Sequence, residues 1–153
     1  MILIDFNAIC IAAAATQRDI NGKDMIRHII LNGLRMHNVA NRKKYGEMVI
    51  CCDSKSWRKD YFPYYKANRK KSRDKSEDEK QYWETVFETI NEVIDDLRNF
   101  FPYKVIKVDG AEADDIIGTL ARQTQEFGHF EDVLIISGDK DFAQLQKYEN
   151  VKQ

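Results

Sequence analysis

Short hydrophobic runs alternate along the chain with longer segments in which hydrophobic residues recur every three or four positions. The short runs are Met1–Ile4, Met48–Cys52, Tyr103–Val108 and Val133–Ile136. Three of them lack polar alternation, which is typical of strands that are buried on both faces of a parallel sheet. The pattern therefore predicts four strands of a mostly parallel sheet.

The longer segments have the spacing of helices that bury one face against a sheet. They are Asp24–Tyr45, Glu79–Phe101 and Ala113–Phe127, and the second of them is followed by Pro102, which cannot continue a helix. Strands that alternate with helices predict an α/β fold, a three-layer sandwich with a mostly parallel central sheet. The pattern leaves the order of the strands open.

One segment, Ser54–Asp78, has no clear period and differs in charge from the rest of the chain. The protein has a net charge of −1, yet Lys55–Lys75 contains nine Lys or Arg residues and two Asp residues. Its aromatic residues are Trp57, Tyr61, Phe62, Tyr64 and Tyr65. Cations neutralise phosphates and aromatic rings stack on bases, so this composition indicates binding of single-stranded or branched nucleic acid. The alternative is a solvated loop above its own packed aromatic side chains.

Length and cysteine content place the chain among intracellular proteins of one domain. It has 153 residues, enough for a single hydrophobic core. Cys51 and Cys52 are adjacent within a predicted strand and would point to opposite faces, which argues against a disulfide framework. No hydrophobic run approaches the roughly 18 residues of a membrane span. We therefore expect a cytoplasmic protein with no membrane association.

Acidic residues follow every predicted strand. They are Asp5, Asp53, Glu112, Asp114, Asp139 and Asp141. The carboxyl ends of parallel strands lie along one edge of an open α/β sheet, where ligands bind. We therefore expect these carboxylates to converge in one cleft. Each of them also has a plainer explanation as a turn residue, a helix cap or a partner of a helix dipole.

Such a convergence of like charges has to be neutralised. Two carboxylates about 4 Å apart repel each other by about 4 kcal/mol at the effective dielectric of a protein surface. Divalent cations remove this repulsion, and ligands that are all oxygen favour Mg²⁺ or Mn²⁺ over zinc. The histidines, His28, His37 and His129, have no metal-ligand spacing.

Two motifs give the expected roles of individual acids. In a helix that begins at Ala113, Glu112 and Asp114 flank the buried face, so we predict them as ligands. Asp115 points away and would face the helix dipole or support the ligands. In an extended chain, Asp139 and Asp141 would lie on one side, where one of them could bridge two ions about 3.5 to 4 Å apart.

Five stretches of the chain carry a resemblance to a known family. They are LIDF at Leu3–Phe6, CCDS at Cys51–Ser54, WRKDYFPYYKANR at Trp57–Arg69, GAEADD at Gly110–Asp115 and SGDKDFAQL at Ser137–Leu145. The chain resembles, over essentially its whole length, the N-terminal part of the 5′ nuclease (flap endonuclease) family. The resemblance is closest to the phage members and extends to the 5′ nuclease domains of bacterial DNA polymerases. GAEADD followed by SGDKDFAQL is the most specific element.

The resemblance implies a fold and an activity. The fold would be that of PIN-like and 5′ nuclease N-terminal domains, with residues 1–153 as one catalytic domain and residues 55–80 as a helical arch. The activity would be that of a Mg²⁺-dependent 5′-to-3′ exonuclease and flap endonuclease with RNase H activity. Its substrates would be branched or 5′-ended DNA and RNA/DNA duplexes, from which it removes primers or flaps during replication. A phage-encoded protein would act in the host cytoplasm.

The resemblance also implies roles for single residues. Asp5, Asp53, Glu112, Asp114 and Asp139 would build a first metal site, and Asp141, with Asp139 shared, would serve a second. Lys66 and Arg69 would hold the scissile and flanking phosphates, and Tyr65 would stack on the terminal base. Arg58, Lys70 and Lys71 would be further contacts to the nucleic acid.

The chain departs from the family pattern where it stops, at Gln153. Family members continue into a region that supplies two more aspartates and a helix-three-turn-helix, so we expect an incomplete second metal site. The expected protein partners are replication proteins or a chain that supplies this region. Two other functions stay open at this point: a module that binds branched nucleic acid without cutting it, and a PIN-like ribonuclease.

Overall fold

A computed structural model describes residues 1–16, 22–69 and 76–153 of the chain. Within these residues, five parallel strands form one sheet in the order β3-β2-β1-β4-β5. The strands are β1 (Ile2–Asp5), β2 (Met48–Cys52), β3 (Lys104–Lys107), β4 (Val133–Ile136) and β5 (Val151–Lys152). The first four are the predicted strands, whereas the two residues of β5 are too few to show a sequence period.

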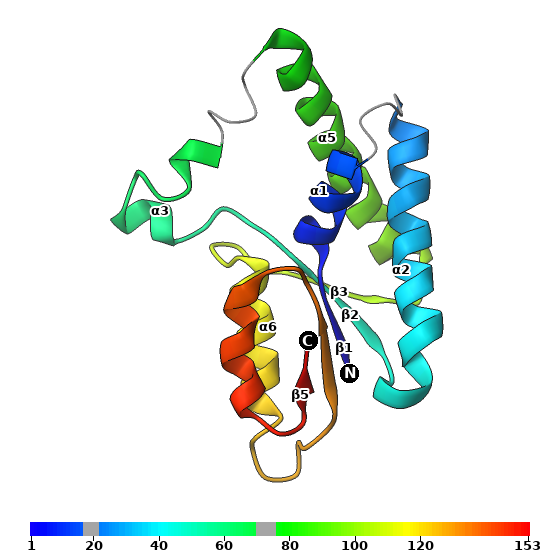
Figure 1. The fold of residues 1–153 in the computed structure, drawn as a ribbon, viewed down its shortest axis with the longest axis vertical. Helices are drawn as coiled ribbons and strands as arrows, with labels where there is room; N and C mark the ends of the chain where they lie inside the picture. Colours follow the sequence, from blue (N-terminus) through cyan, green and yellow to red (C-terminus); the bar gives the residue numbers. More distant parts are fainter. Residues whose placement is uncertain (17–21, 70–75) are drawn as a thin grey trace.

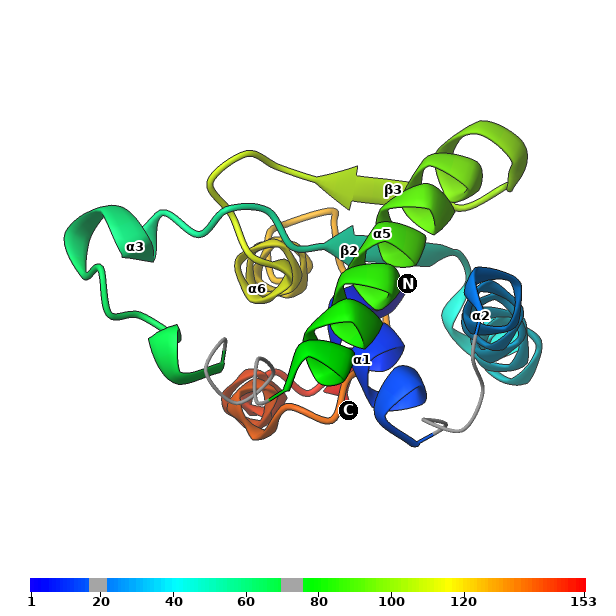
Figure 2. The ribbon, with the colours of Figure 1, turned by 90° about the horizontal axis from the view of Figure 1, so that it is seen from above.

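Helices cover both faces of the sheet, which confirms the predicted three-layer sandwich. One face carries α1 (Phe6–Thr16), α2 (Lys23–Tyr45) and α5 (Glu77–Phe100), and the other carries α6 (Ala113–Gln123) and the 3₁₀ helix η1 (Lys140–Lys147) (Figure 1). Seen from above, the short helix α3 (Arg58–Tyr61) lies away from both layers, on a segment that projects beyond the sheet (Figure 2).

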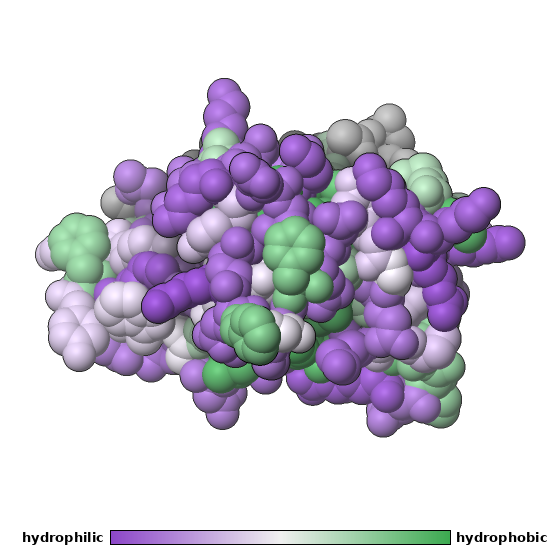
Figure 3. Space-filling model, turned by 90° about the horizontal axis from the view of Figure 1, so that it is seen from below, coloured by the Kyte–Doolittle hydropathy of each residue, from purple (hydrophilic) through white to green (hydrophobic). Residues whose placement is uncertain are grey.

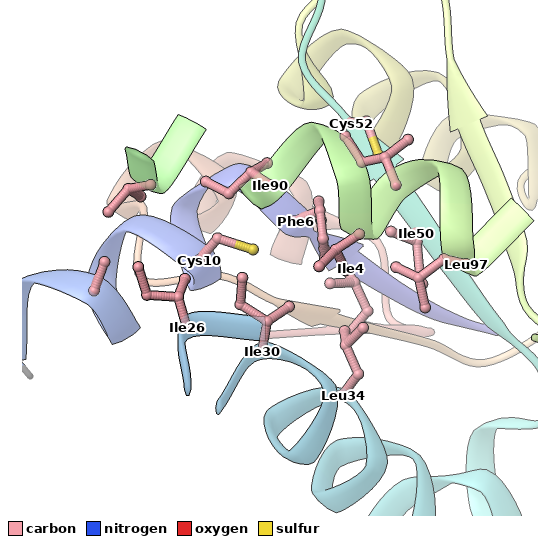
Figure 4. Packing of buried hydrophobic residues seen from close by; sticks show 14 of the residues in the cluster. Ile4, Phe6, Cys10, Ile26, Ile30, Leu34, Ile50, Cys52, Ile90 and Leu97 are labelled. Carbon is pink, nitrogen blue, oxygen red and sulfur yellow. The ribbon is translucent and has the colours of Figure 1, made fainter. Parts of the chain in front are cut away.

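Alternate side chains of the central strands enter two separate hydrophobic clusters. Ile2 and Ile4 of β1 pack against α1, α2 and α5, whereas Leu3 packs against α6. Figure 4 shows the first cluster, in which side chains of the strands and of these three helices point toward one another. Cys51 and Cys52 face opposite clusters, as predicted for neighbours in a strand, and both are free thiols.

Helix α1 is absent from the sequence prediction because its residues are hydrophobic on nearly all sides, so no polar face marks a period. The buried residues Phe6, Cys10 and Ala14 are spaced four apart and form the face that enters the core. A run of alanines follows Ile11, and alanine has the highest helix propensity of all residue types.

The segment after β4 corrects a second expectation. The expected placement of Asp139 and Asp141 on one side assumed an extended chain, and this condition is not met, because η1 begins at Lys140. Asp139 caps that helix, with its Oδ1 accepting a hydrogen bond from the amide of Asp141 at 2.9 Å. The two carboxylates therefore do not have the alternation of an extended strand.

No helix in the described ranges is both long enough and hydrophobic enough to cross a membrane. Seen from below, isolated hydrophobic side chains stand out from a mainly hydrophilic surface (Figure 3).

Candidate metal and nucleic-acid site

All strands of the sheet run in the same direction, so the acids that follow them lie along its carboxyl edge. Asp5 is the last residue of β1, and Asp53 follows β2 directly. Glu112 is the N-cap of α6, and Asp139 is the N-cap of η1. The chain from β1 to β3 proceeds in one direction across the sheet and β4 lies on the other side of β1, so the edge contains a topological switch point.

Asp5 is 5% exposed and joins three elements. Its Oδ1 accepts a hydrogen bond from the amide of Ala8 (3.2 Å), which caps the start of α1. Its Oδ2 accepts one from the hydroxyl of Ser137 (2.7 Å), just beyond β4. Burial raises the pKa of Asp5, and the charges of Asp53 and Asp139 raise it further. Asp5 is therefore both the cap of α1 and a neighbour of other acids.

Asp53 connects β2 to the start of α6. Its Oδ1 accepts a hydrogen bond from the amide of Ala113 at 2.8 Å. Its own amide donates to Oδ1 of Asn7 at 3.2 Å, which ties the same position to α1. Asp53 thus holds the first turn of α6, and with it Asp114, close to the end of β1.

Asp114 has the strongest electrostatic perturbation among these acids. Burial raises the pKa of Asp114 to about 6, helped by the charges of Asp5, Asp53 and Asp139 and opposed by Lys66. These four aspartates come from four separate parts of the sequence. Their mutual repulsion is the electrostatic signature of a site that receives positive charge.

Glu112 is compensated in a different way, by donors of the basic segment. Its carboxylate, 8% exposed, accepts hydrogen bonds from four side chains. These are Ser56 (3.1 Å), Arg58 (3.0 Å), Tyr65 (2.9 Å) and Lys66 (2.7 Å). Although burial alone would raise the pKa of Glu112, the hydrogen bonds from Lys66 and Tyr65 lower it. Glu112 therefore holds the described part of the basic segment against the edge of the sheet.

Asp115 supports this arrangement from the same first turn of α6. Its two oxygens accept hydrogen bonds from Arg58 at 2.9 and 2.8 Å, and Oδ2 also accepts the amide of Glu112 at 3.0 Å. The hydrogen bonds from Arg58 lower the pKa of Asp115. The guanidinium of Arg58 lies 4.9 Å from the ring centroid of Trp57. Arg58, which we predicted as a phosphate contact, is thus occupied by two carboxylates and a ring.

Lys66 is the non-glycine residue with positive φ in the described part of the chain, at +55°. This left-handed conformation is unfavourable for a residue with a Cβ and is retained where surrounding contacts hold it. Here the Nζ–Glu112 contact fixes the side chain. Arg69 lies three residues further on and is exposed, and Lys70 and Lys71 lie outside the described residues.

Asp139 and Asp141 are separated by their roles in η1. Asp139 is half-buried next to Ser137, whose Oγ accepts its amide at 3.1 Å, whereas Asp141 is exposed. Among the residues described, no three His, Cys, Asp or Glu side chains form a cluster ready to hold an ion. The aspartates that interact through their charges are nevertheless all oxygen donors, which is the chemistry that hard divalent cations require.

Comparison with known proteins gives the family. The model of the family described as "5′-3′ exonuclease, N-terminal resolvase-like domain" matches residues 1–153. The chain belongs to this family.

Two relatives of the 5′-3′ exonuclease N-terminal domain illustrate its range. The chain is 42% identical over 159 aligned residues to ribonuclease H of Enterobacteria phage T4, covering 99% of this chain and 50% of that protein. It is 39% identical to DNA polymerase I of Rhizobium leguminosarum, covering 76% of this chain and 10% of the polymerase. The chain therefore spans half the length of the phage ribonuclease H.

Solved structures share the fold. The 5′-exonuclease of phage T5 with bound divalent metal ions (zinc) matches with a TM-score of 0.73 and 19% identity, over 99% of this chain and 53% of that one. A T5 flap endonuclease in complex with DNA and metal ions matches with a TM-score of 0.69 and 21% identity, over 98% of this chain and 52% of that one. At this level of identity the likeness concerns the fold.

Three polar residues of this 5′-3′ exonuclease N-terminal domain take part in the site without having been predicted. Ser56 donates to Glu112, Ser137 donates to Asp5, and Asn7 accepts the amide of Asp53. Each lies within three residues of a predicted acid, and this proximity was the available signal. Serine and asparagine are common after strands for reasons of turn formation, so the sequence alone did not separate the two roles.

Proposed function

We propose that this chain holds the metal-dependent active site of a 5′ nuclease that cleaves phosphodiester bonds near 5′ ends or flaps of branched DNA or RNA/DNA. The observation that carries the proposal is the raised pKa of Asp114, caused by its burial and by three acids from other strand ends. In this proposal residues 1–153 are one catalytic domain with an arch at residues 55–80, and the protein removes primers or flaps in the cytoplasm.

The proposed ion is Mg²⁺ or Mn²⁺, held by Asp5, Asp53, Asp114 and Asp139. Bound there, it would supply an activated water and would neutralise charge that develops on the phosphate. Glu112 would complete this set if one of its four donors left it. Asp141, the exposed neighbour in η1, is the candidate ligand for a second ion.

The chain's own cations would position the substrate. Lys66 adjoins Glu112 and opposes the raised pKa of Asp114, so its ammonium is placed to hold the scissile phosphate beside the acids. Tyr65 would stack on the terminal base, and Arg69 would hold a flanking phosphate, with Lys70 and Lys71 beyond it. Arg58 would add a phosphate contact only by giving up one of its carboxylate partners.

One assay tests this function. The substrate is a duplex with a labelled 5′ flap, incubated with the protein in Mg²⁺, in Mn²⁺ and in a chelator. We expect cleavage only with the metals, and loss of cleavage in Asp114→Asn and Asp139→Asn. Asp95→Asn is the matched control, because Asp95 is exposed on α5. Metal-independent cleavage that persists in both site variants would contradict the proposal.

The same assay separates two further candidates. A module that binds without cutting is favoured by the four donors that already occupy the carboxylate of Glu112. It would show salt-dependent binding, weakened by Lys66→Ala and Arg69→Ala, with no product even in Mn²⁺. A PIN-like ribonuclease would prefer unstructured RNA to branched DNA.

A further inference from the structure

A groove runs between α6 and η1, starting at the acidic edge of the sheet and leading away from it. It has a volume of about 330 Å³, which is within the range of ligand-binding clefts. Its lining residues on α6 include Asp114, Gly118 and Arg122, and those on η1 include Asp141, Phe142 and Gln144. None of the described residues of the basic segment, 55–69, belongs to this lining.

The two ends of the groove differ in charge. Asp114 and Asp141 lie at the end that belongs to the proposed metal site, and Arg122 lies two turns further along α6. Within the described ranges no carboxylate pairs with Arg122, which is exposed. By contrast, Arg58 and Lys66 are both paired with carboxylates. Arg122 is therefore a cation available to an anionic ligand.

The floor and wall of the groove suit a sugar–phosphate chain. Phe142 is buried beneath it and Gly118 leaves it open, since a Cβ added at that glycine would meet no atom within 4 Å. The side-chain amide of Gln144 donates to the carbonyl of Asp141 (2.8 Å) and has a second hydrogen to donate. Thr119 already donates its hydroxyl to the carbonyl of Asp115, so Arg122 and Gln144 are the donors toward a phosphate.

We propose that this groove holds the backbone of the substrate strand beyond the site of cleavage, with Arg122 contacting a phosphate. The inference rests on the proposed nuclease function. Eight residues of helix separate Arg122 from Asp114, which corresponds to about 12 Å. A B-form strand advances about 3.4 Å per phosphate along its axis, so Arg122 would meet the third or fourth phosphate from the acids.

A purely structural role makes a different prediction. Arg122 is in the last turn of α6, where a positive charge stabilises the helix dipole. If this were its whole contribution, removing the charge would affect thermal stability and leave nucleic-acid binding unchanged. Binding and stability therefore have to be measured on the same variants.

The experiment measures anisotropy of a fluorescein-labelled 5′-flap DNA duplex in EDTA, from 50 to 200 mM salt. We expect Arg122→Ala to weaken binding about three- to tenfold and to reduce the slope of log K against log salt by about 0.9. Arg122→Lys should keep the slope. Gly118→Leu should fill the groove and weaken binding without loss of thermal stability, because Leu is a better helix former than Gly.

The controls separate failure of this inference from failure of the proposed function. Arg35→Ala removes an exposed arginine from α2, on the opposite layer of the molecule, and should change neither affinity nor slope (Figure 2). If Lys66→Ala weakens binding while Arg122→Ala and Gly118→Leu do not, the groove is not a nucleic-acid site. If the wild-type protein neither binds nor cleaves the flap, the proposed function fails as well.

Discussion

At Asp114 the fold holds a carboxylate in a place where its charged form is disfavoured. Its pKa is raised to about 6, whereas an aspartate in an unfolded chain titrates near 3.9. The folded state therefore binds a proton more readily than the unfolded state. The cost to stability is fully present above about pH 6 and disappears as the pH falls toward about 4.

Asp114→Asn should therefore stabilise the metal-free protein near pH 8 and have no such effect near pH 3.5. The shift corresponds to at most about 3 kcal/mol, and solvent screening reduces the expected gain to about 1 to 2 kcal/mol. Urea unfolding in a chelator at both pH values measures it. Asp95→Asn should give no pH-dependent gain, and an equal effect of Asp114→Asn at both pH values would contradict the assigned charge repulsion.

The Arg58–Asp115 pair makes a second prediction at the residue scale. Two hydrogen bonds join its planar groups, and both side chains are about 30% exposed or less. A double-mutant cycle with Arg58→Ala and Asp115→Ala should give a coupling free energy of about 1 kcal/mol. The exposed Lys80–Glu77 pair at 3.5 Å is the comparison, with about 0.3 kcal/mol expected. Equal couplings would show that Arg58 does not anchor the segment.

At the scale of single elements, the turn that ends at Lys66 depends on an unfavourable backbone conformation. Glycine adopts a φ of +55° without penalty, whereas alanine does not. Lys66→Gly and Lys66→Ala both lose the ion pair with Glu112, so their difference isolates the backbone. We expect the Gly variant to be about 1 kcal/mol more stable in urea unfolding. A more stable Ala variant would mean that the left-handed turn is absent in solution.

Helices that bury only one face were easier to predict from the sequence than helices that are hydrophobic on all sides. α2 and α5 bury one stripe and expose the other, and the sequence period located both within two residues at each end. α1 is hydrophobic on nearly all sides, so the period is lost although the helix forms. η1 depends on a capping hydrogen bond between Asp139 and Asp141, which a strand-like alternation of acids does not reveal.

For the candidate site, the parallel sheet made the meeting of Asp5, Asp53, Asp114 and Asp139 predictable. Their strands had to end on one edge, and the charges of all four interact. The four donors that meet at Glu112 were not predictable, because they depend on how the segment after β2 folds back onto α6. The same limit applies to the proposed role of Arg122, because the sequence does not show that η1 lies beside α6.

For the whole molecule, ion binding should be visible as stability. A ligand that binds only the folded state at 100 times its dissociation constant adds about 2.7 kcal/mol. We expect Mn²⁺ or Mg²⁺ to raise the unfolding temperature and a chelator to reverse the rise. Asp5→Asn and Asp139→Asn should abolish the shift, whereas Asp95→Asn should keep it. A shift of the same size in all three variants would place the ion elsewhere.

The order of the strands also constrains when the molecule can acquire its acid cluster during synthesis. β1 emerges first from the ribosome, yet one of its two neighbours in the sheet is β4, which ends at Ile136. Ser137, which donates to Asp5, follows directly. A nascent chain therefore contains Asp5, Asp53 and Asp114 before it contains β4, the strand that brings Asp139 beside them. The proposed ion site can therefore form only after β4 and the residues that follow it have been made.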